Sequence, residues 1–193
     1  MRSTLLCVLA IALMPGLGHA QGPVYTITPG DSSIQFSVKS SVALAGKFDQ
    51  WHATLKFLSP DVTSAVFGID IEAASVDTGS GMKNNKLKGK DFFDVAHYPT
   101  ITFHSTKVVQ TGPVTFDVDG NFFIRGVERP EVLKLTISGK GTGAGAVSGV
   151  MVFNRRHYGM TKGIPFVRIE DHVTVTINIH GRRVSGSPLV YKQ

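Results

Sequence analysis

Hydrophobic and polar residues alternate along most of this chain. The alternation is clearest over residues 34–39, 53–57, 67–72, 101–104, 114–119, 133–138 and 173–180. Because successive side chains of a strand point to opposite faces of a sheet, each run predicts a strand with one dry and one wet face. Two more strands are expected around residues 121–125 and 147–153, with a tight hairpin turn at Asp119-Gly120-Asn121.

Residues 81–95 do not alternate. Their apolar members are spaced for one or two helical turns rather than for a strand, and they are separated by lysines and asparagines. These apolar residues are Met82, Leu87, Phe92, Phe93 and Val95. We therefore expect a short helix whose leucine and phenylalanine side chains pack at the mouth of a barrel.

So many short strands joined by turns predict an all-β domain. We expect an antiparallel barrel of about eight strands with one short helix, because closure leaves no exposed sheet edge. A sandwich is the competing arrangement. The interior of an eight-stranded barrel can be packed solid or can hold one small ligand, so the interior is where we look for function.

The first twenty residues have the layout of a secretory signal peptide. Arg2 precedes an apolar run from Leu5 to Met14, and Gly18-His19-Ala20 offers a cleavage site after Ala20. The protein is therefore predicted to be periplasmic or secreted. The only cysteine, Cys7, falls inside this segment, so no disulfide is expected. The predicted organisation is a signal peptide over residues 1–20, one barrel domain over residues 21–185 and a tail over residues 186–193.

The chain carries a formal net charge of +6, with its basic residues dispersed. A basic excess favours anionic surfaces, so transient contact with a membrane surface is one expectation. A solvated surface without any partner is the other interpretation. Nucleic acid is not an expected partner, because the aromatic residues fall mostly on the dry face, where they could not stack on bases.

No pattern in the sequence indicates catalysis. The six histidines that follow the signal peptide include no pair at metal-binding spacing, and no Gly-x-Ser-x-Gly motif is found. Asp70 and Glu72 share the wet face of one strand, where carboxylates are usually surface charge. The sequence thus predicts a protein that is not an enzyme and has no metal or cofactor.

Four segments stand out together by their order and spacing. They are Val76-Asp77-Thr78-Gly79, residues 87–95 (LKGKDFFDV) running into residues 98–103 (YPTITF), residues 123–127 (FIRGV) with Pro130, and Asn154-Arg155 with Tyr158-Gly159-Met160. In this arrangement they resemble the YceI-like family of bacterial periplasmic polyisoprenoid-binding proteins. The resemblance covers nearly the whole predicted mature chain, from Tyr25 to Ile179.

This resemblance implies a lipocalin-like barrel with a long apolar tunnel. The tunnel would hold a polyisoprenoid or an isoprenoid quinone without altering it, and the family also suggests a homodimer. The chain departs from the family pattern at three histidine positions, where it has Asp31, Ser40 and Lys86. If those histidines contact the ligand, this protein differs in ligand or in affinity.

The residues predicted to contact the lipid lie on the dry faces or in the matched segments. They are Phe36, Val38, Phe57, Phe67, Phe92, Phe93, Phe103, Ile124, Arg125, Phe153, Arg155 and Met160. The two arginines have two interpretations, which are contact with a polar head or pyrophosphate, or pairing with a carboxylate such as Asp91 or Asp94. The predicted function is a periplasmic lipid-binding or carrier protein. The alternative is a secreted structural or stress-response barrel in which the same apolar residues form a solid core.

Overall fold

Strands form almost all of the regular structure in residues 22–191, the part of the chain that this computed structural model describes. They are β1 (Val24–Ile27), β2 (Ser33–Ser40), β3 (Leu44–Phe48), β4 (Trp51–Phe57), β5 (Ala65–Glu72), β6 (Val76–Asp77), β7 (Thr100–Gln110), β8 (Thr115–Ile124), β9 (Val127–Ile137), β10 (Ala144–Asn154) and β11 (Ile169–Ser185). The helices are α1 (Gly81–Lys88) and the short 3-10 helices η1 (Pro29–Asp31), η2 (Val62–Ser64), η3 (Ala73–Ser75) and η4 (Arg155–Tyr158). The predicted signal peptide lies outside the described residues.

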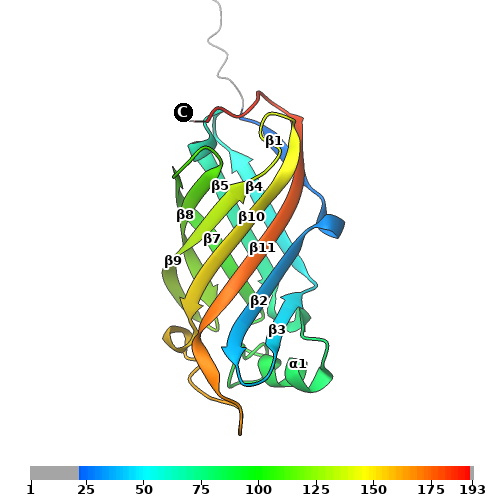
Figure 1. The fold of residues 1–193 in the computed structure, drawn as a ribbon, viewed down its shortest axis with the longest axis vertical. Helices are drawn as coiled ribbons and strands as arrows, with labels where there is room; N and C mark the ends of the chain where they lie inside the picture. Colours follow the sequence, from blue (N-terminus) through cyan, green and yellow to red (C-terminus); the bar gives the residue numbers. More distant parts are fainter. Residues whose placement is uncertain (1–21, 192–193) are drawn as a thin grey trace, which may run out of the picture.

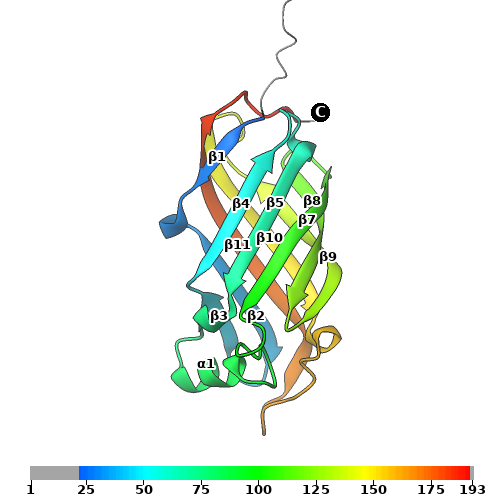
Figure 2. The same cartoon turned by 180° about the vertical axis from the view of Figure 1, so that it is seen from behind.

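Eight strands close into a barrel through the pairing of β1 with both β4 and β11, and the barrel is seen in Figure 1 and from behind in Figure 2. Hydrogen-bonded neighbours follow the order β4-β5-β7-β8-β9-β10-β11-β1, and β1 pairs with β4 as well as with β11. The pairs that close the barrel are antiparallel, with Tyr25 opposite Arg183 and Val24 opposite Lys56. The prediction of an all-β antiparallel barrel with one short helix is thus confirmed.

Strands β2, β3 and β6 extend the wall at one end of the barrel. The 17-residue strand β11 pairs with β1 near its end and with β2 near its start, and β3 and β6 follow β2 in the sheet. Helix α1 comes directly after β6 and lies at the same end (Figure 1). We name this end, with α1, η4 and the turn at residues 41–43, the lower end. The upper end holds residues 138–143 and residues 186–191.

The tail is described as far as Tyr191, and this part is held against the upper end. The Val62 amide donates to the Val190 carbonyl at 3.0 Å, and the Val190 amide donates to the Pro60 carbonyl at 2.8 Å. The Tyr191 ring lies 6.3 Å from the Phe116 ring, measured between centroids. These contacts make the tail part of the upper end of the barrel.

The predicted hairpin turn at Asp119-Gly120-Asn121 is wrong. Strand β8 passes through these residues, and the chain reverses at Arg125 and Gly126, whose φ angles are 54° and 75°. Two positive φ angles in succession are typical of a two-residue type I′ hairpin turn. Gly120 instead faces the barrel interior, where a Cβ would lie only 2.4 Å from the Phe103 ring. This glycine makes room for a neighbouring ring and does not bend the chain.

A layer of inward-facing residues fills the middle of the barrel, and we call it the belt. Along β5, for example, Phe67 faces the upper space, Ile69 belongs to the belt and Ile71 faces the lower space. Each of β2, β4, β5, β7, β8, β9, β10 and β11 contributes one residue to it. The belt consists of Ile34, Ala53, Ile69, Phe103, Gly120, Leu133, Met151 and Ile177. The free space below the belt and the free space above it share no lining residue, so the interior is divided into a lower and an upper part and the continuous tunnel that the family resemblance implies is interrupted.

Candidate functional site

The lower pocket lies between the belt and helix α1. It contains about 650 Å³ of space free of protein atoms, a volume that includes open solvent at the pocket, and its lining surface is entirely apolar. Its walls come from the barrel strands, from β2 and β3 of the extension, and from the segment that follows α1. Elements far apart in sequence thus surround one hydrophobic space.

Phenylalanine rings form much of this wall. The ring centroid of Phe36 lies 5.6 Å from that of Phe48 and 6.4 Å from that of Phe93, and the last two lie 5.9 Å apart. The three pairs are tilted or edge-on. On the barrel side, the rings of Phe122 and Phe153 lie 5.0 Å apart. Such ring pairs stabilise one another beyond their buried area, and their faces can cover an apolar ligand without a polar partner.

Helix α1 and the turn after it close the lower end. The Phe93 amide donates to the Leu87 carbonyl at 2.9 Å, and the Lys86 ammonium pairs with the Asp91 carboxylate at 2.7 Å. The hydrogen bond from Lys86 also lowers the pKa of Asp91. These bonds bring the side chains of Leu87, Phe92 and Phe93 inward, and all three are buried. The prediction of a short helix that packs its leucine and phenylalanines inward is confirmed for Leu87, whereas Phe92 and Phe93 lie in the turn after the helix.

Arg155 is buried beside the lower pocket, with 5% of its surface exposed. Its Nε donates to the Glu170 carbonyl at 3.1 Å, and one terminal nitrogen donates to the carbonyls of Met160 and Lys162. The other terminal nitrogen lies 3.0 Å from the Asp171 carboxylate. The guanidinium therefore ties η4 to the start of β11, while the aliphatic part of the side chain lines the pocket.

Neither predicted arginine pairs with Asp91 or Asp94, so that part of the prediction is wrong. Arg125 donates to the Lys90 carbonyl at 2.8 Å and to the Gly159 carbonyl at 3.0 Å, which joins the segment after α1 to the end of η4. The expected ion pair exists only for Arg155, and its partner is Asp171, near the start of β11. Because backbone carbonyls engage both guanidinium groups, the geometry supports a structural role for these arginines over contact with a polar head.

The twelve predicted ligand residues separate into two groups. Phe103 belongs to the belt, Phe57 and Phe67 face the upper part of the interior, and Arg125 lies among backbone carbonyls. The other eight come together around the lower pocket: Phe36, Val38, Phe92, Phe93, Ile124, Phe153, Arg155 and Met160.

The predicted set of ligand contacts omits more than half of the lower-pocket lining, although Leu87 was expected at the barrel mouth. Most of the missed residues occupy alternate positions of strands that were predicted, so their inward orientation could have been read from the sequence. Strand β3 could not, because five residues interrupted by Gly46 give too short a pattern. The missed residues are Leu44, Phe48, Ile71, Leu87, Ile101, Phe122, Ile169, Val173 and Val175.

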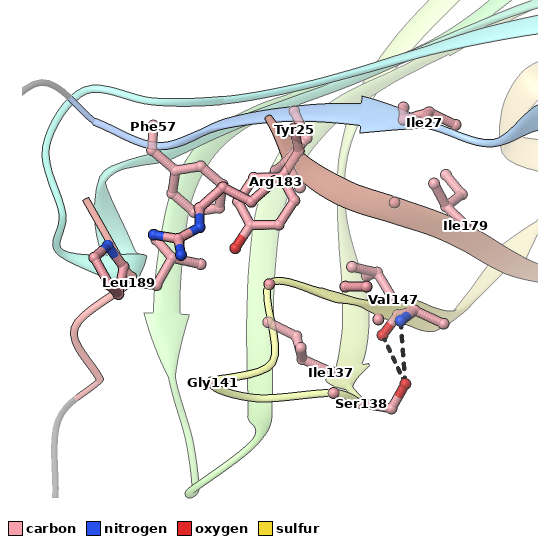
Figure 3. Close-up of a pocket in the computed structure, with 18 of the residues that line it drawn as sticks. Tyr25, Ile27, Phe57, Ile137, Ser138, Gly141, Val147, Ile179, Arg183 and Leu189 are labelled. Atoms are coloured by element: carbon pink, nitrogen blue, oxygen red, sulfur yellow. Dashed lines mark hydrogen bonds between the residues drawn. The ribbon is translucent and has the colours of Figure 1, made fainter. Parts of the chain in front are cut away.

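The upper pocket differs in its lining. It contains about 760 Å³ of space, and Figure 3 shows Tyr25, Phe57 and Arg183 on one side and the glycine-rich loop near Gly141 on another. Arg183 donates to the Gly186 carbonyl at 3.1 Å, and within residues 22–191 it forms no ion pair. Burial raises the pKa of the Tyr25 hydroxyl, an effect that the nearby Arg183 opposes.

A smaller apolar space of about 410 Å³ lies between the upper pocket and the belt. It shares Leu55, Phe57, Ile137 and Val147 with the upper pocket, so the two spaces adjoin along the wall. Within the described part of the chain, no cluster of histidine, cysteine or acidic side chains could hold a metal ion. No helix of residues 22–191 has the length and hydrophobicity needed to cross a membrane.

Comparison with known proteins identifies the family. The model of the YceI-like domain matches residues 25–181. The chain belongs to the YceI-like family. A "UPF0312 protein" of Azotobacter vinelandii is 28% identical over 145 residues, which are 73% of this chain and 76% of that protein. Another, from Pseudomonas savastanoi, is 35% identical over 96 residues. This second match, like others at similar identity, spans about half the length of the curated relative.

Solved structures show the same fold. BcnA of Burkholderia cenocepacia matches with a TM-score of 0.73 at 24% identity, over 80% of this YceI-like chain and 99% of BcnA. A domain of Saccharophagus degradans, described as a polyisoprenoid-binding domain, matches with a TM-score of 0.62 at 14% identity, over 83% of this chain and 99% of that domain. At these identities the likeness establishes the architecture alone.

Proposed function

We propose that this protein binds a long apolar lipid, a polyisoprenoid or an isoprenoid quinone, in the lower pocket, and that it carries or stores this lipid without altering it. The observation that carries the proposal is the lining of the pocket, which presents hydrocarbon and aromatic surface throughout. The similar fold of the Saccharophagus degradans polyisoprenoid-binding domain supports the same class of ligand.

Burial of hydrocarbon alone can supply the binding energy. At about 25 cal/mol per Å², a prenyl chain that buries roughly 500 Å² would gain about 12 kcal/mol before the cost of immobilising the chain. The free energy that remains after this cost suffices for micromolar affinity without any hydrogen bond to the lipid. The belt limits how deeply a chain can enter, so the rest of a long chain would extend through the lower mouth unless the belt side chains move.

We also propose that the protein acts after export, in the periplasm or outside the cell, because residues 1–20 have the layout of a signal peptide. A homodimer is proposed from the family resemblance. Native mass spectrometry of protein secreted by its host would test both points and the ligand together. We expect an N-terminus at Gln21, a dimer mass, and a bound species that organic extraction releases as an isoprenoid.

Two matched substitutions test the place of binding. Val38 lines the lower pocket and Val147 lines the upper part of the interior. Val38→Trp fills the lower pocket, so uptake of an isoprenoid quinone, followed by native mass spectrometry, should weaken at least about tenfold. Val147→Trp should leave uptake unchanged. The reverse result would place the lipid at the upper end.

A second candidate function is a secreted structural or stress-response barrel that holds no lipid. The belt favours it, since buried side chains meet across the middle of the barrel as in an ordinary core. The decisive sample is wild-type protein purified without detergent. If organic extraction releases no lipid and added quinone is not taken up, the carrier proposal fails and this second candidate replaces it.

A further inference from the structure

Three elements at the lower end adjoin the lining of the lower pocket, and each also carries one exposed apolar side chain. Helix α1 turns Leu87 into the pocket while Met82, at its start, is 84% exposed. The turn at residues 41–43 connects two strands that line the pocket, and its Val42 is 45% exposed. The loop between η4 and β11 runs between the lining residues Met160 and Ile169, and its Phe166 is fully exposed.

Hydrogen bonds join these three elements into one rim. The Ser41 amide donates to the Arg168 carbonyl at 3.0 Å, and the Arg168 amide donates to the Ser41 hydroxyl at 3.1 Å. The Lys83 ammonium donates to the Ala43 carbonyl at 2.8 Å. The turn that carries Val42 is thus fixed to the Phe166 loop on one side and to α1 on the other. We call Val42, Met82, Phe166 and the basic residues among them the lower rim.

Phe166 occupies a position that the folded chain itself does not require. It follows Pro165 in a turn closed by a hydrogen bond of 3.0 Å from the Val167 amide to the Ile164 carbonyl. Its φ angle is 63°, a region that suits glycine and is rare for a bulky side chain. The loop projects at the lower end of the barrel (Figure 1). A strained backbone that holds an aromatic ring in water gains nothing for folding, which points to a partner.

The lower rim is also basic. Residues 81–91 contain Lys83, Lys86, Lys88 and Lys90 against the single carboxylate of Asp91. The loop before β11 adds Lys162 and Arg168, and Lys86, Lys90 and Lys162 all lie close enough to Asp91 to lower its pKa. The other carboxylates at this end are Asp77, Asp94, Glu170 and Asp171, and Asp171 pairs with Arg155 and Arg156, so the basic side chains still outnumber the acidic ones. Positive charge therefore surrounds the exposed apolar side chains.

We propose that the lower rim docks on a bilayer that contains anionic phospholipid. Phe166, Met82 and Val42 enter the interface between headgroups and acyl chains, and the surrounding lysines meet the phosphate groups. In this orientation the mouth of the apolar pocket faces the membrane, so a lipid could pass between them without crossing water. That consequence rests on the proposed function, whereas docking itself depends only on the rim.

Flotation with phosphatidylcholine vesicles, with and without about one-third phosphatidylglycerol, tests the docking directly. We expect wild-type protein to float with the anionic vesicles and to be released as salt is raised. Phe166→Asp should lower the partition coefficient about tenfold. Leu58→Asp is the matched control, because Leu58 is 77% exposed at the upper end, and it should float like wild type.

Charge reversals test the electrostatic part. The double change Lys90→Glu with Lys162→Glu should lower the partition coefficient at least about tenfold. Lys56→Glu with Lys107→Glu alters the net charge equally on exposed strand positions away from the rim, and it should have little effect. Phe166→Gly relieves the strained turn, so it should keep or raise the unfolding midpoint while it weakens flotation. A purely structural role for Phe166 would give the opposite pair of results.

The docking proposal is overturned if wild-type protein does not float, or if both double variants lose binding equally. It is also overturned if Phe166→Asp leaves flotation intact but converts a dimer to a monomer in sedimentation velocity, because the rim would then be a contact between two copies. Quinone uptake from solution, measured on the same samples, keeps the two proposals separate. Uptake without flotation removes docking alone, and flotation without uptake removes the lipid carrier alone.

Discussion

At the lower end of the barrel, helix α1, η4 and two extra strands enclose a pocket whose surface is apolar throughout. At the upper end, a glycine-rich loop and the last described residues lie over a pocket of similar size that contains tyrosine hydroxyls and a guanidinium. Each end has an arginine at its pocket. Arg155 is buried and held by three carbonyls and a carboxylate, whereas Arg183 is partly exposed and bonds one carbonyl.

The lower pocket therefore has a rigid wall, whereas the upper pocket has a cover that can move. The lower pocket is bounded by buried rings and a buried charge, which lose their partners if the wall moves, so its shape is determined before any ligand arrives. The upper pocket is covered by a loop and a chain end, the kinds of segment that open most readily. A preformed apolar pocket is the better receptor for a lipid without polar groups, because little ordering has to accompany binding.

The largest expected effect tests the belt that keeps the two ends apart. Phe103→Asp places an unpaired charge in the packed middle of the barrel, so it should lower the free energy of unfolding by about 4 kcal/mol or more and abolish lipid uptake with it. Val109→Asp, on the outward face of the same strand, should cost no more than about 1.5 kcal/mol. Urea denaturation followed by circular dichroism measures both. A larger loss for Val109→Asp than for Phe103→Asp would mean that the inward and outward faces of β7 are reversed.

A smaller effect compares the two arginines. Arg155→Met leaves the carbonyls of Met160, Lys162 and Glu170 without their donor, so we expect a loss of about 3 kcal/mol in the free energy of unfolding. Arg183→Met removes one exposed hydrogen bond and should cost less than about 1 kcal/mol. Urea midpoints at neutral pH provide the comparison. If the two losses are equal, the lower wall is no more firmly fixed than the upper cover.

The smallest effect is a pH dependence at the lower end. Hydrogen bonding to Arg156, with the charge of Arg155 nearby, lowers the pKa of Asp171 below its usual value of 3.8. The stabilisation is therefore present above that value and is lost as the pH falls through the lower pKa of the folded state. Between pH 5 and pH 3 (about the range that matters for a carboxyl group), Asp171→Asn should show a shallower decline in thermal midpoint than wild type. A decline that is unchanged in this variant would assign the acid sensitivity to other carboxyl groups.

The fold could be predicted from the sequence because period-two alternation was present in nearly every barrel strand. The prediction was wrong where the same local composition can arise for two different reasons. Asp119-Gly120-Asn121 has the composition of a turn, but Gly120 is small because the Phe103 ring lies against it from the neighbouring strand. Strands β1, β3 and β6 are two to five residues long, too short for a pattern, and pairing with neighbouring strands defines them.

The candidate site was partly accessible from the sequence for the same reason. Alternation and the matched motifs found Phe36, Phe93 and Phe153, which line the lower pocket. They also selected Phe103 and Phe67, because a pattern along one strand reports which face a residue is on and not how far along the barrel it lies. The sequence did not reveal the partner of Arg155, because Asp171 lies at the start of β11 and comes close only after the intervening loop has folded back.

By itself, then, the sequence determined which side chains face inward, and with them the closed antiparallel barrel. Only the tertiary structure decided that these side chains meet in a belt, that the space on either side forms two unlike pockets, and that Val42, Met82 and Phe166 surround one mouth. The physical reason is that facing is a local property of the pleated backbone, whereas empty space depends on how far side chains from opposite walls reach toward one another.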